Sequence, residues 1–117
     1  MTNNVAMQAA VVTMLVAKRP ALAKLPIRWE LRANGEVTVS ADLGADGSLV
    51  PQIAAELARA MRGPRTESYD LTDDDGTITR AFEVEARVSG IQVKFYGYQR
   101  GLQSAEASTV VEGGEGK

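Results

Sequence analysis

The stretch TITRAFEVEARVSGIQVKFYGYQ, residues 77–99, decides the fold, because two runs of alternating side chains flank the dipeptide Ser89-Gly90. A tight turn at this dipeptide brings the strands 77–88 and 91–99 into one antiparallel register. One face then carries the pairs Val88–Ile91, Ala86–Val93, Val84–Phe95 and Phe82–Gly97, and the other carries Arg87–Gln92 and Glu85–Lys94. We expect a long hairpin with one buried face, in which the Phe82 ring covers the bare backbone of Gly97.

A second hairpin is predicted over residues 27–41, and the alternation of its side chains selects the loop. A two-residue turn at Asn34-Gly35 would pair Leu31 with a threonine and mix the two faces. A three-residue loop, residues 33–35, instead pairs Leu31 with Val37 and keeps the apolar side chains on one face. Gly35 then takes the left-handed position of a type I turn followed by a bulge.

The remaining segments complete an α+β domain. Residues 50–62 form an amphipathic helix that ends at Gly63-Pro64, and residues 65–71 form a strand that reverses at the Asp73-Asp74-Asp75-Gly76 turn. The predicted order is αββαβββ, a five-stranded, mostly antiparallel sheet with two helices on one face. We assign residues 1–100 to this single α+β domain and residues 101–117 to a flexible acidic tail.

A first helix over residues 3–18 is apolar around most of its circumference, and Val12, Leu15 and Val16 belong to that apolar surface. A helix of this kind is buried, either within its own domain or against a second protein. In so small a domain we favour a homodimer or partner contact through these three residues over burial within the chain. The apolar run is too short for a membrane span, which takes about 20 residues, and basic residues follow it instead of preceding it as in a signal peptide.

The composition argues against several classes of function. The 117 residues contain no histidine and no cysteine, which removes the commonest general base, the commonest metal ligand and the thiolate nucleophile. The net charge of −2 provides no strongly basic surface for nucleic acid or anionic lipid. We expect a cytoplasmic, non-enzymatic protein with no cofactor or metal and no nucleic-acid or membrane partner.

The polar face of the predicted sheet offers a candidate binding site. Lys94, Tyr96 and Tyr98 share this face by the parity of their strand. Tyrosine combines a large apolar ring with a hydroxyl group and therefore suits a surface that contacts another protein. We expect a partner contact through these three residues.

Arg80 is discordant, because its parity puts it on the apolar face, across from Tyr69 and diagonal to Glu67. We expect a partly buried Glu67–Arg80 ion pair to satisfy the guanidinium. The alternative is an arginine that meets a ligand or a partner at the end of the sheet. The acidic run just before it, residues 70–75, lacks the ligand spacing of a calcium-binding loop and is interpreted as a hairpin turn.

Four segments carry a resemblance: Leu25-Pro26-Ile27-Arg28-Trp29, Asn34-Gly35, the helix over 50–62, and Val88-Ser89-Gly90-Ile91-Gln92-Val93. Across about residues 25–99 the chain resembles small actinobacterial proteins of no assigned function, which are often carried by phages or integrated elements. The resemblance implies no activity, and it covers neither the first helix nor the tail.

Together these observations favour a protein–protein interaction module. If the resemblance to phage-carried proteins holds, its target is a host or defence protein. Two alternatives stay open. One is a small acidic dimeric chaperone or assembly factor, which would bind an extended segment along a strand edge or groove. The other is a small-molecule-binding domain with its pocket between the helices and the sheet.

Overall fold

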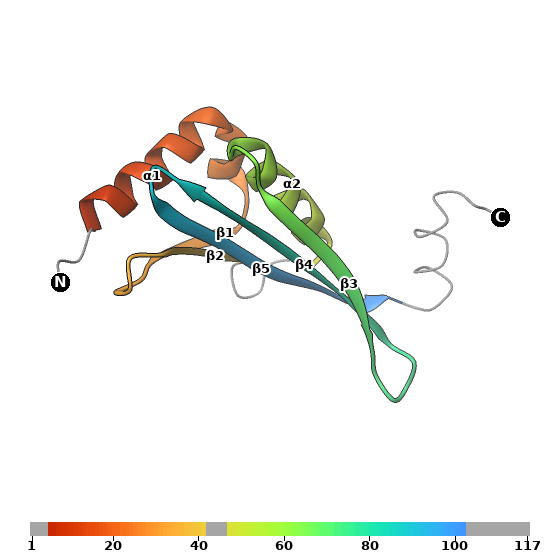
Figure 1. The fold of residues 1–117 in the computed structure, drawn as a ribbon. Helices are drawn as coiled ribbons and strands as arrows, with labels where there is room; N and C mark the ends of the chain where they lie inside the picture. The colour runs from red at the N-terminus through yellow and green to blue at the C-terminus, as the bar shows by residue number, and fades with distance from the viewer. Residues whose placement is uncertain (1–4, 42–46, 103–117) are drawn as a thin grey trace.

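Two helices cover one face of a five-stranded sheet in the computed structural model, which describes residues 5–41 and 47–102 (Figure 1). The elements are, in chain order, α1 (Val5–Lys18), the 3-10 helix η1 (Pro20–Lys24), β1 (Ile27–Leu31), β2 (Val37–Ala41), the 3-10 helix η2 (Gly47–Leu49), α2 (Val50–Ala60), β3 (Arg65–Thr72), β4 (Ile78–Val88) and β5 (Ile91–Leu102). The α+β class and the αββαβββ order are as predicted. Most of the predicted tail lies outside the described residues, but its first two residues, 101 and 102, belong to β5.

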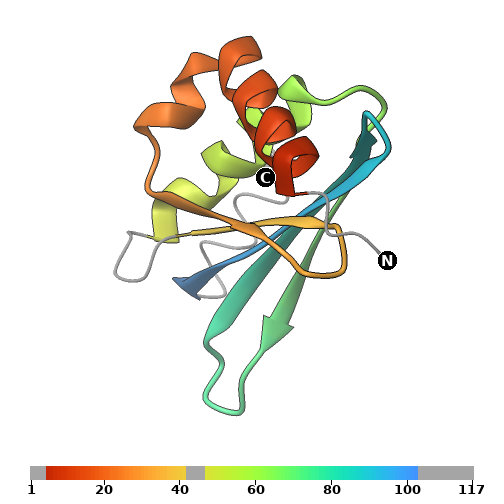
Figure 2. The same cartoon turned by 90° about the vertical axis from the view of Figure 1, so that its left-hand side faces the viewer.

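The sheet has the strand order β1-β2-β5-β4-β3, and among the described strands only the β2–β5 pair is parallel. The parallel pair arises because α2 carries the chain across the sheet after β2, and the β3-β4-β5 meander then returns β5 beside β2 in the same direction. α2 packs on β4 and β5, whereas α1 packs on α2, β1 and β5. Both helices therefore lie on the same side of the sheet, as Figure 2 shows.

The hydrophobic core fills the space between these helices and the inner face of the sheet. Every element except η2 and β3 contributes to it, with β1 half-buried at its margin. Its fully buried large side chains are Val11, Leu15, Leu22, Val37, Val39, Val50, Ile53, Leu57, Val84, Val93 and Phe95. Burying apolar side chains of this size stabilises the fold by about 1.5–3 kcal/mol each, so this half of the molecule holds the sheet in place.

The predicted registers of the first and last hairpins are confirmed. The paired residues are Leu31–Val37 and Trp29–Val39 in β1–β2, and Val88–Ile91, Arg87–Gln92, Ala86–Val93, Glu85–Lys94, Val84–Phe95 and Phe82–Gly97 in β4–β5. Ser89 and Gly90, with φ of 51° and 81°, form the tight turn that joins β4 to β5. The condition that all apolar residues lie on one face therefore predicted the correct pairing in both the β1–β2 and the β4–β5 hairpin.

The space above Gly97 is occupied by a different ring from the one predicted. A Cβ atom on Gly97 would lie 2.7 Å from Cζ of Phe95 and 2.8 Å from Cγ1 of Val50. Phe95 precedes Gly97 by two residues on the same face of β5, and its ring lies along the strand over the glycine. Phe82 is opposite Gly97 as predicted, but its side chain borders a cleft beside α2. The prediction that Phe82 covers Gly97 was wrong.

The β1–β2 loop is the predicted three-residue loop. The Arg32 amide donates to the Glu36 carbonyl at 2.8 Å and closes the ladder. Gly35 has φ of +94°, a left-handed conformation that glycine adopts without steric cost. The side-chain oxygen of Asn34 accepts a hydrogen bond from the Glu36 amide at 3.0 Å. The short polar side chain thus stabilises the turn locally.

The β3–β4 loop has the same geometry. The Asp73 amide donates to the Thr77 carbonyl at 2.9 Å, and Gly76 has φ of +86°. Asp75 Oδ1 accepts a hydrogen bond from the Thr77 amide at 2.9 Å, and this bond lowers the pKa of the Asp75 carboxyl. The predicted turn interpretation of this acidic run is confirmed, with a loop of residues 74–76.

Gln8 fixes α1 to the first of these two loops. Its side chain is fully buried, and Nε2 donates to the carbonyls of Arg32 and Glu36 at 2.9 and 2.7 Å. Within the described residues, Oε1 of Gln8 is buried without a hydrogen-bond partner. A buried hydrogen bond contributes about 0.5–1.5 kcal/mol. Two of them to adjacent strand ends hold the hairpin under the helix.

An ion pair joins the end of α1 to α2. Arg19 Nε donates to Glu56 Oε1 at 2.7 Å, and Glu56 is 8% exposed. The hydrogen bond from Arg19 lowers the pKa of Glu56, in spite of the opposing effect of desolvation. The two helices are therefore held together by this pair as well as by apolar packing.

Candidate protein-interaction surface

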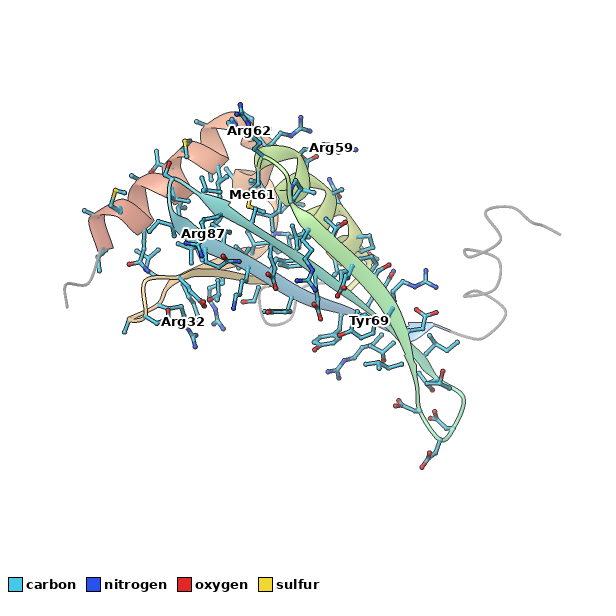
Figure 3. All side chains as sticks on the ribbon, in the orientation of Figure 1. Arg32, Arg59, Met61, Arg62, Tyr69 and Arg87 are labelled. Carbon is cyan, nitrogen blue, oxygen red and sulfur yellow. The ribbon has the colours of Figure 1, made fainter. Side chains whose placement is uncertain are left out.

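The open face of the sheet, opposite the helices, divides into a charged end and an aromatic end. Arg32 and Arg87 lie at the end beside the β1–β2 loop and the β4–β5 turn, and Tyr69 lies towards the β3–β4 loop (Figure 3). The chain has three tyrosines, and all of them lie at the aromatic end. We define the tyrosine patch as Tyr69, Leu71, Tyr96 and Tyr98, whose exposed fractions are 43%, 48%, 42% and 48%.

Strand register explains why these side chains lie together. Tyr69 on β3 pairs with Ala81 on β4, and Ala81 pairs in turn with Tyr98 on β5. Cross-strand neighbours of this kind have Cβ atoms about 5 Å apart. Ala81 is 1% exposed although it lies on the open face, because the two rings flank its methyl group. The register therefore brings the rings of Tyr69 and Tyr98 to neighbouring positions on one face of the sheet.

Carboxylates border the tyrosine patch. The Tyr69 hydroxyl donates to Glu83 Oε2 at 2.8 Å, which orients the ring across β4. This hydrogen bond, together with desolvation and the nearby negative charge, raises the pKa of Tyr69. Glu83 pairs with Glu67 across β3–β4 and with Tyr96 across β4–β5. The patch thus presents aromatic rings beside negative charge.

The structure places the predicted residues Lys94, Tyr96 and Tyr98 on one face, as their parity required. Tyr96 and Tyr98 belong to the tyrosine patch, but Lys94 lies nearer the charged end. Its Nζ is 3.3 Å from Glu36 Oε2, and the hydrogen bond that Lys94 donates to Glu36 raises the pKa of Lys94. The lysine is therefore already engaged within the chain.

The predicted Glu67–Arg80 pair does not form. Arg80 lies opposite Asp70 in the β3–β4 register, and its Nε and Nη2 donate to the two carboxylate oxygens of Asp70 at 2.7 and 3.1 Å. The bidentate contact lowers the pKa of Asp70. Glu67 instead lies 3.6 Å from Arg65 on the other face. The prediction was wrong by one residue of register, because the β3–β4 loop is one residue longer than it assumed.

The same register error is the reason why Tyr69 was not predicted to lie on the open face of the sheet. The prediction put Tyr69 across from Arg80 on the apolar face, whereas the three-residue loop turns it onto the open face. The signal was in the sequence: Asp75-Gly76 repeats the Asn34-Gly35 arrangement, for which the longer loop had been derived. Applying the same loop to both hairpins places Tyr69 level with Tyr98 and Leu71 on the same face.

α1 presents two different faces. Leu15 is fully buried in the core of its own chain, so the prediction that it contacts a partner was wrong. Val12 and Val16 are half-buried and pack against the same core. Apart from Lys18 at its end, the exposed side chains of α1 are apolar or small, and the large ones are Val5, Met7 and Met14, which are 46%, 46% and 37% exposed. The helix is buried on one face by its own domain and remains apolar on the other.

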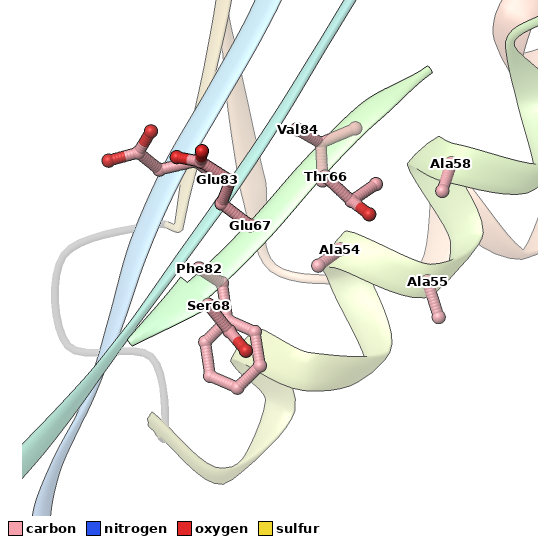
Figure 4. Close-up of a pocket in the computed structure, with 9 residues that line it drawn as sticks. All are labelled: Ala54, Ala55, Ala58, Thr66, Glu67, Ser68, Phe82, Glu83 and Val84. Carbon is pink, nitrogen blue, oxygen red and sulfur yellow. The ribbon is translucent and has the colours of Figure 1, made fainter. Parts of the chain in front are cut away.

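A cleft of about 370 Å³ lies between α2 and β3 (Figure 4). Ala54, Ala55 and Ala58 line it on the helix, and Thr66, Ser68 and Phe82 line it on the sheet. Glu67 and Glu83 contribute to the rim, and their side chains point away from α2. The surface inside the cleft is thus made mainly of methyl groups, hydroxyls and one aromatic ring.

Among the described residues there is no group of three or more acidic side chains, or of other metal-binding ones, arranged to hold a metal ion. None of the described helices is long and apolar enough to cross a membrane.

The chain matches no protein-family model, and comparisons with curated proteins and with solved structures find no match either.

Proposed function

We propose that this protein is a non-enzymatic interaction module that binds a partner protein through the tyrosine patch. The observation that carries the proposal is the gathering of all three tyrosines, each at least 42% exposed, on the open face of one sheet. A sheet face in contact with water alone has no need of large aromatic side chains. Three of them together form a surface that another protein can cover.

The physical properties of the patch suit a protein contact. Tyrosine loses little conformational entropy on binding, because its ring has few rotatable bonds, and it is frequent among the residues that dominate interface energies. Here the rings stand on paired strands, and one hydroxyl is already oriented by Glu83. The partner therefore meets a preformed surface, which reduces the cost of association.

We place this interaction in the cytoplasm, because the chain contains no cysteine to support a disulfide-dependent extracellular fold. The resemblance to phage-carried actinobacterial proteins supports a host or defence protein as the partner. A carboxylate border favours a partner with basic or hydrogen-bond-donating groups around an apolar centre.

The exposed face of α1 supports self-association as a second property. Met7 and Met14 project from one side of a helix whose only charged residue is Lys18 at its end. A second copy packed antiparallel against it would keep the two cationic ends apart. Met14→Glu, which spares the core, should convert a dimer into a monomer in sedimentation equilibrium. A wild-type protein that is monomeric at high micromolar concentration would exclude this property.

The proposal is tested by removing two rings of the patch. The double variant Tyr96→Ser, Tyr98→Ser and the matched control Arg32→Ser, Arg87→Ser alter the two ends of the same sheet face. Each protein is used to capture partners from nuclease-treated lysate of an actinobacterial host, with quantitative mass spectrometry. We expect a stoichiometric partner whose recovery falls at least tenfold for the tyrosine variant and is unchanged for the arginine variant.

Equal recovery of the partner by both variants would contradict the proposal, as would the absence of any stoichiometric partner. Unchanged thermal unfolding of the tyrosine variant shows that the loss is one of binding and not of folding. A metabolite that raises the melting temperature of the wild type would instead favour a ligand-binding domain.

A further inference from the structure

The outer edge of β3 is open along its whole length. In the described part of the chain β3 ends the sheet, and all eight of its residues are exposed. Its pairing with β4 is continuous from Arg65 to Thr72 without a bulge. Natural edge strands are commonly blunted by a bulge, a proline or short length. β3 has none of these three features, although it carries the charged side chains of Arg65, Glu67 and Asp70.

The hairpin closure shows which main-chain groups of β3 face outwards. Hydrogen-bonded and non-hydrogen-bonded pairs alternate along an antiparallel ladder. Because Asp73 bonds to Thr77, the odd-numbered residues of β3 bond to β4. The even-numbered residues, Thr66, Ser68, Asp70 and Thr72, therefore direct their N–H and C=O groups away from β4, where an added strand can bond to them.

The cleft beside this edge can receive the side chains of an added strand. It lies on the helix side of β3, between Ala55 and Ala58 of α2 and the short side chains of Thr66 and Ser68. A strand added next to β3 would project every second side chain towards α2. A volume of about 370 Å³ has room for two or three medium-sized apolar side chains.

The charges beside the edge indicate which side chains an added strand should present on the open face of the sheet. On the open face, Glu67 is half-exposed and its nearest cation, Arg65, is 3.6 Å away. Asp73, Asp74 and Asp75 are exposed at the end of the hairpin. An occupant whose remaining side chains are basic would complement this surface.

We propose that β3 and the α2–β3 cleft bind an extended peptide segment of a partner protein as a sixth strand. In the segment, apolar residues facing α2 alternate with basic or polar residues facing Glu67. A second copy of this chain fits less well. The side chains that its own β3 would offer to the cleft are Thr66, Ser68, Asp70 and Thr72, which are short and polar. The proposal rests on the proposed function in that the partner is a protein, but it uses different residues.

The test uses a displayed library of random decapeptides and a matched pair of edge variants. Ser68→Pro removes an outward N–H group and places a ring on the edge, whereas Ser68→Ala keeps the N–H group. Because residue 68 does not donate to β4, both variants should keep the fold, which their far-ultraviolet circular dichroism verifies. A third variant, Ala58→Leu, fills the cleft from the helix.

We expect selection on the full-length wild type to enrich peptides that alternate apolar with basic residues. The affinity of an enriched peptide should fall at least tenfold for Ser68→Pro and for Ala58→Leu, and stay within twofold for Ser68→Ala. Binding should slow hydrogen exchange at the amides of residues 66, 68 and 70. No enrichment, equal binding by the proline and alanine variants, or unchanged exchange at these amides would overturn the proposal.

The tyrosine-patch proposal and the β3-edge proposal can be overturned independently of each other. Enriched peptides that bind Tyr96→Ser, Tyr98→Ser normally but not Ser68→Pro would support the edge site whether or not the tyrosine patch binds a partner. A natural partner lost by the tyrosine variant but retained by Ser68→Pro would support the patch and overturn the edge site. Dimerisation that Ser68→Pro abolishes would show that a second copy occupies the edge.

Discussion

The β1–β2 and β3–β4 hairpins are built on the same loop and end in opposite surroundings. Each closes with two main-chain hydrogen bonds and carries a glycine with positive φ. In each, an Asn or Asp side chain accepts a hydrogen bond from the main-chain amide two residues further along the chain. The first loop is anchored to α1 by the buried Gln8. The second projects beyond the helices, and β3 is exposed throughout (Figure 1). The turn residues determine the geometry of each loop, whereas packing against the helices determines whether the hairpin is part of the core or exposed.

The largest expected difference comes from removing one leucine of α1, the helix to which the first hairpin is anchored, and one leucine of the projecting hairpin. Leu15→Ala should destabilise the protein by about 3–5 kcal/mol, because a fully buried side chain leaves a cavity under α1. Leu71→Ala on the projecting hairpin should cost about 0.5 kcal/mol or less, because Leu71 is 48% exposed. Urea unfolding measures both values. Similar costs for the two variants would show that β3 is covered as well as α1 is.

Gln8→Glu should break the attachment of the first hairpin. A buried carboxylate would face the carbonyls of Arg32 and Glu36 in place of an amide donor, at a cost of about 3 kcal/mol near neutral pH. Burial raises the pKa of such a carboxyl group. Protonation at lower pH should therefore recover part of the loss relative to the wild type. Urea unfolding at pH 7 and pH 5 checks this, and a cost independent of pH would contradict it.

The two loop glycines should respond alike. Gly35→Ala and Gly76→Ala each force a side chain into the left-handed region, with no atom within 4 Å of the added Cβ. Each should cost about 1 kcal/mol, for backbone reasons alone. Thermal unfolding of the two variants compares them directly. A clearly larger cost at Gly35 would show that the anchored loop tolerates less rearrangement than the projecting one.

Acid should weaken both ion pairs, Arg19–Glu56 and Arg80–Asp70. The pKa of Glu56 is lowered by Arg19, and that of Asp70 by Arg80. A lowered folded pKa contributes stability above the unfolded value, near pH 4, and this stability is lost as the pH falls through the folded value. Melting temperatures between pH 6 and pH 3 should therefore fall less steeply for Glu56→Gln and for Asp70→Asn than for the wild type. Parallel curves would contradict the assignment.

Most of the fold was predictable, because the period of alternation and the turn residues leave few registers that keep both faces uniform. The β1–β2 and β4–β5 pairings followed from that condition alone. The candidate site was predicted in part. Tyr96 and Tyr98 were identified from the alternation of side chains along their strand, whereas Tyr69 was missed because the predicted β3–β4 register was shifted by one residue. Such a slip moves every side chain of a strand to the other face.

The sequence by itself determined the elements, the turns and the sharing of one face by Tyr96 and Tyr98, because these depend on neighbours a few residues apart. Only the tertiary structure decided that Leu15 is internal and that β3 is an open edge beside a cleft. These facts depend on which strand lies next to which and on where α2 crosses the sheet. Such contacts join residues far apart in the sequence, and the alternation of side chains along the chain does not predict them.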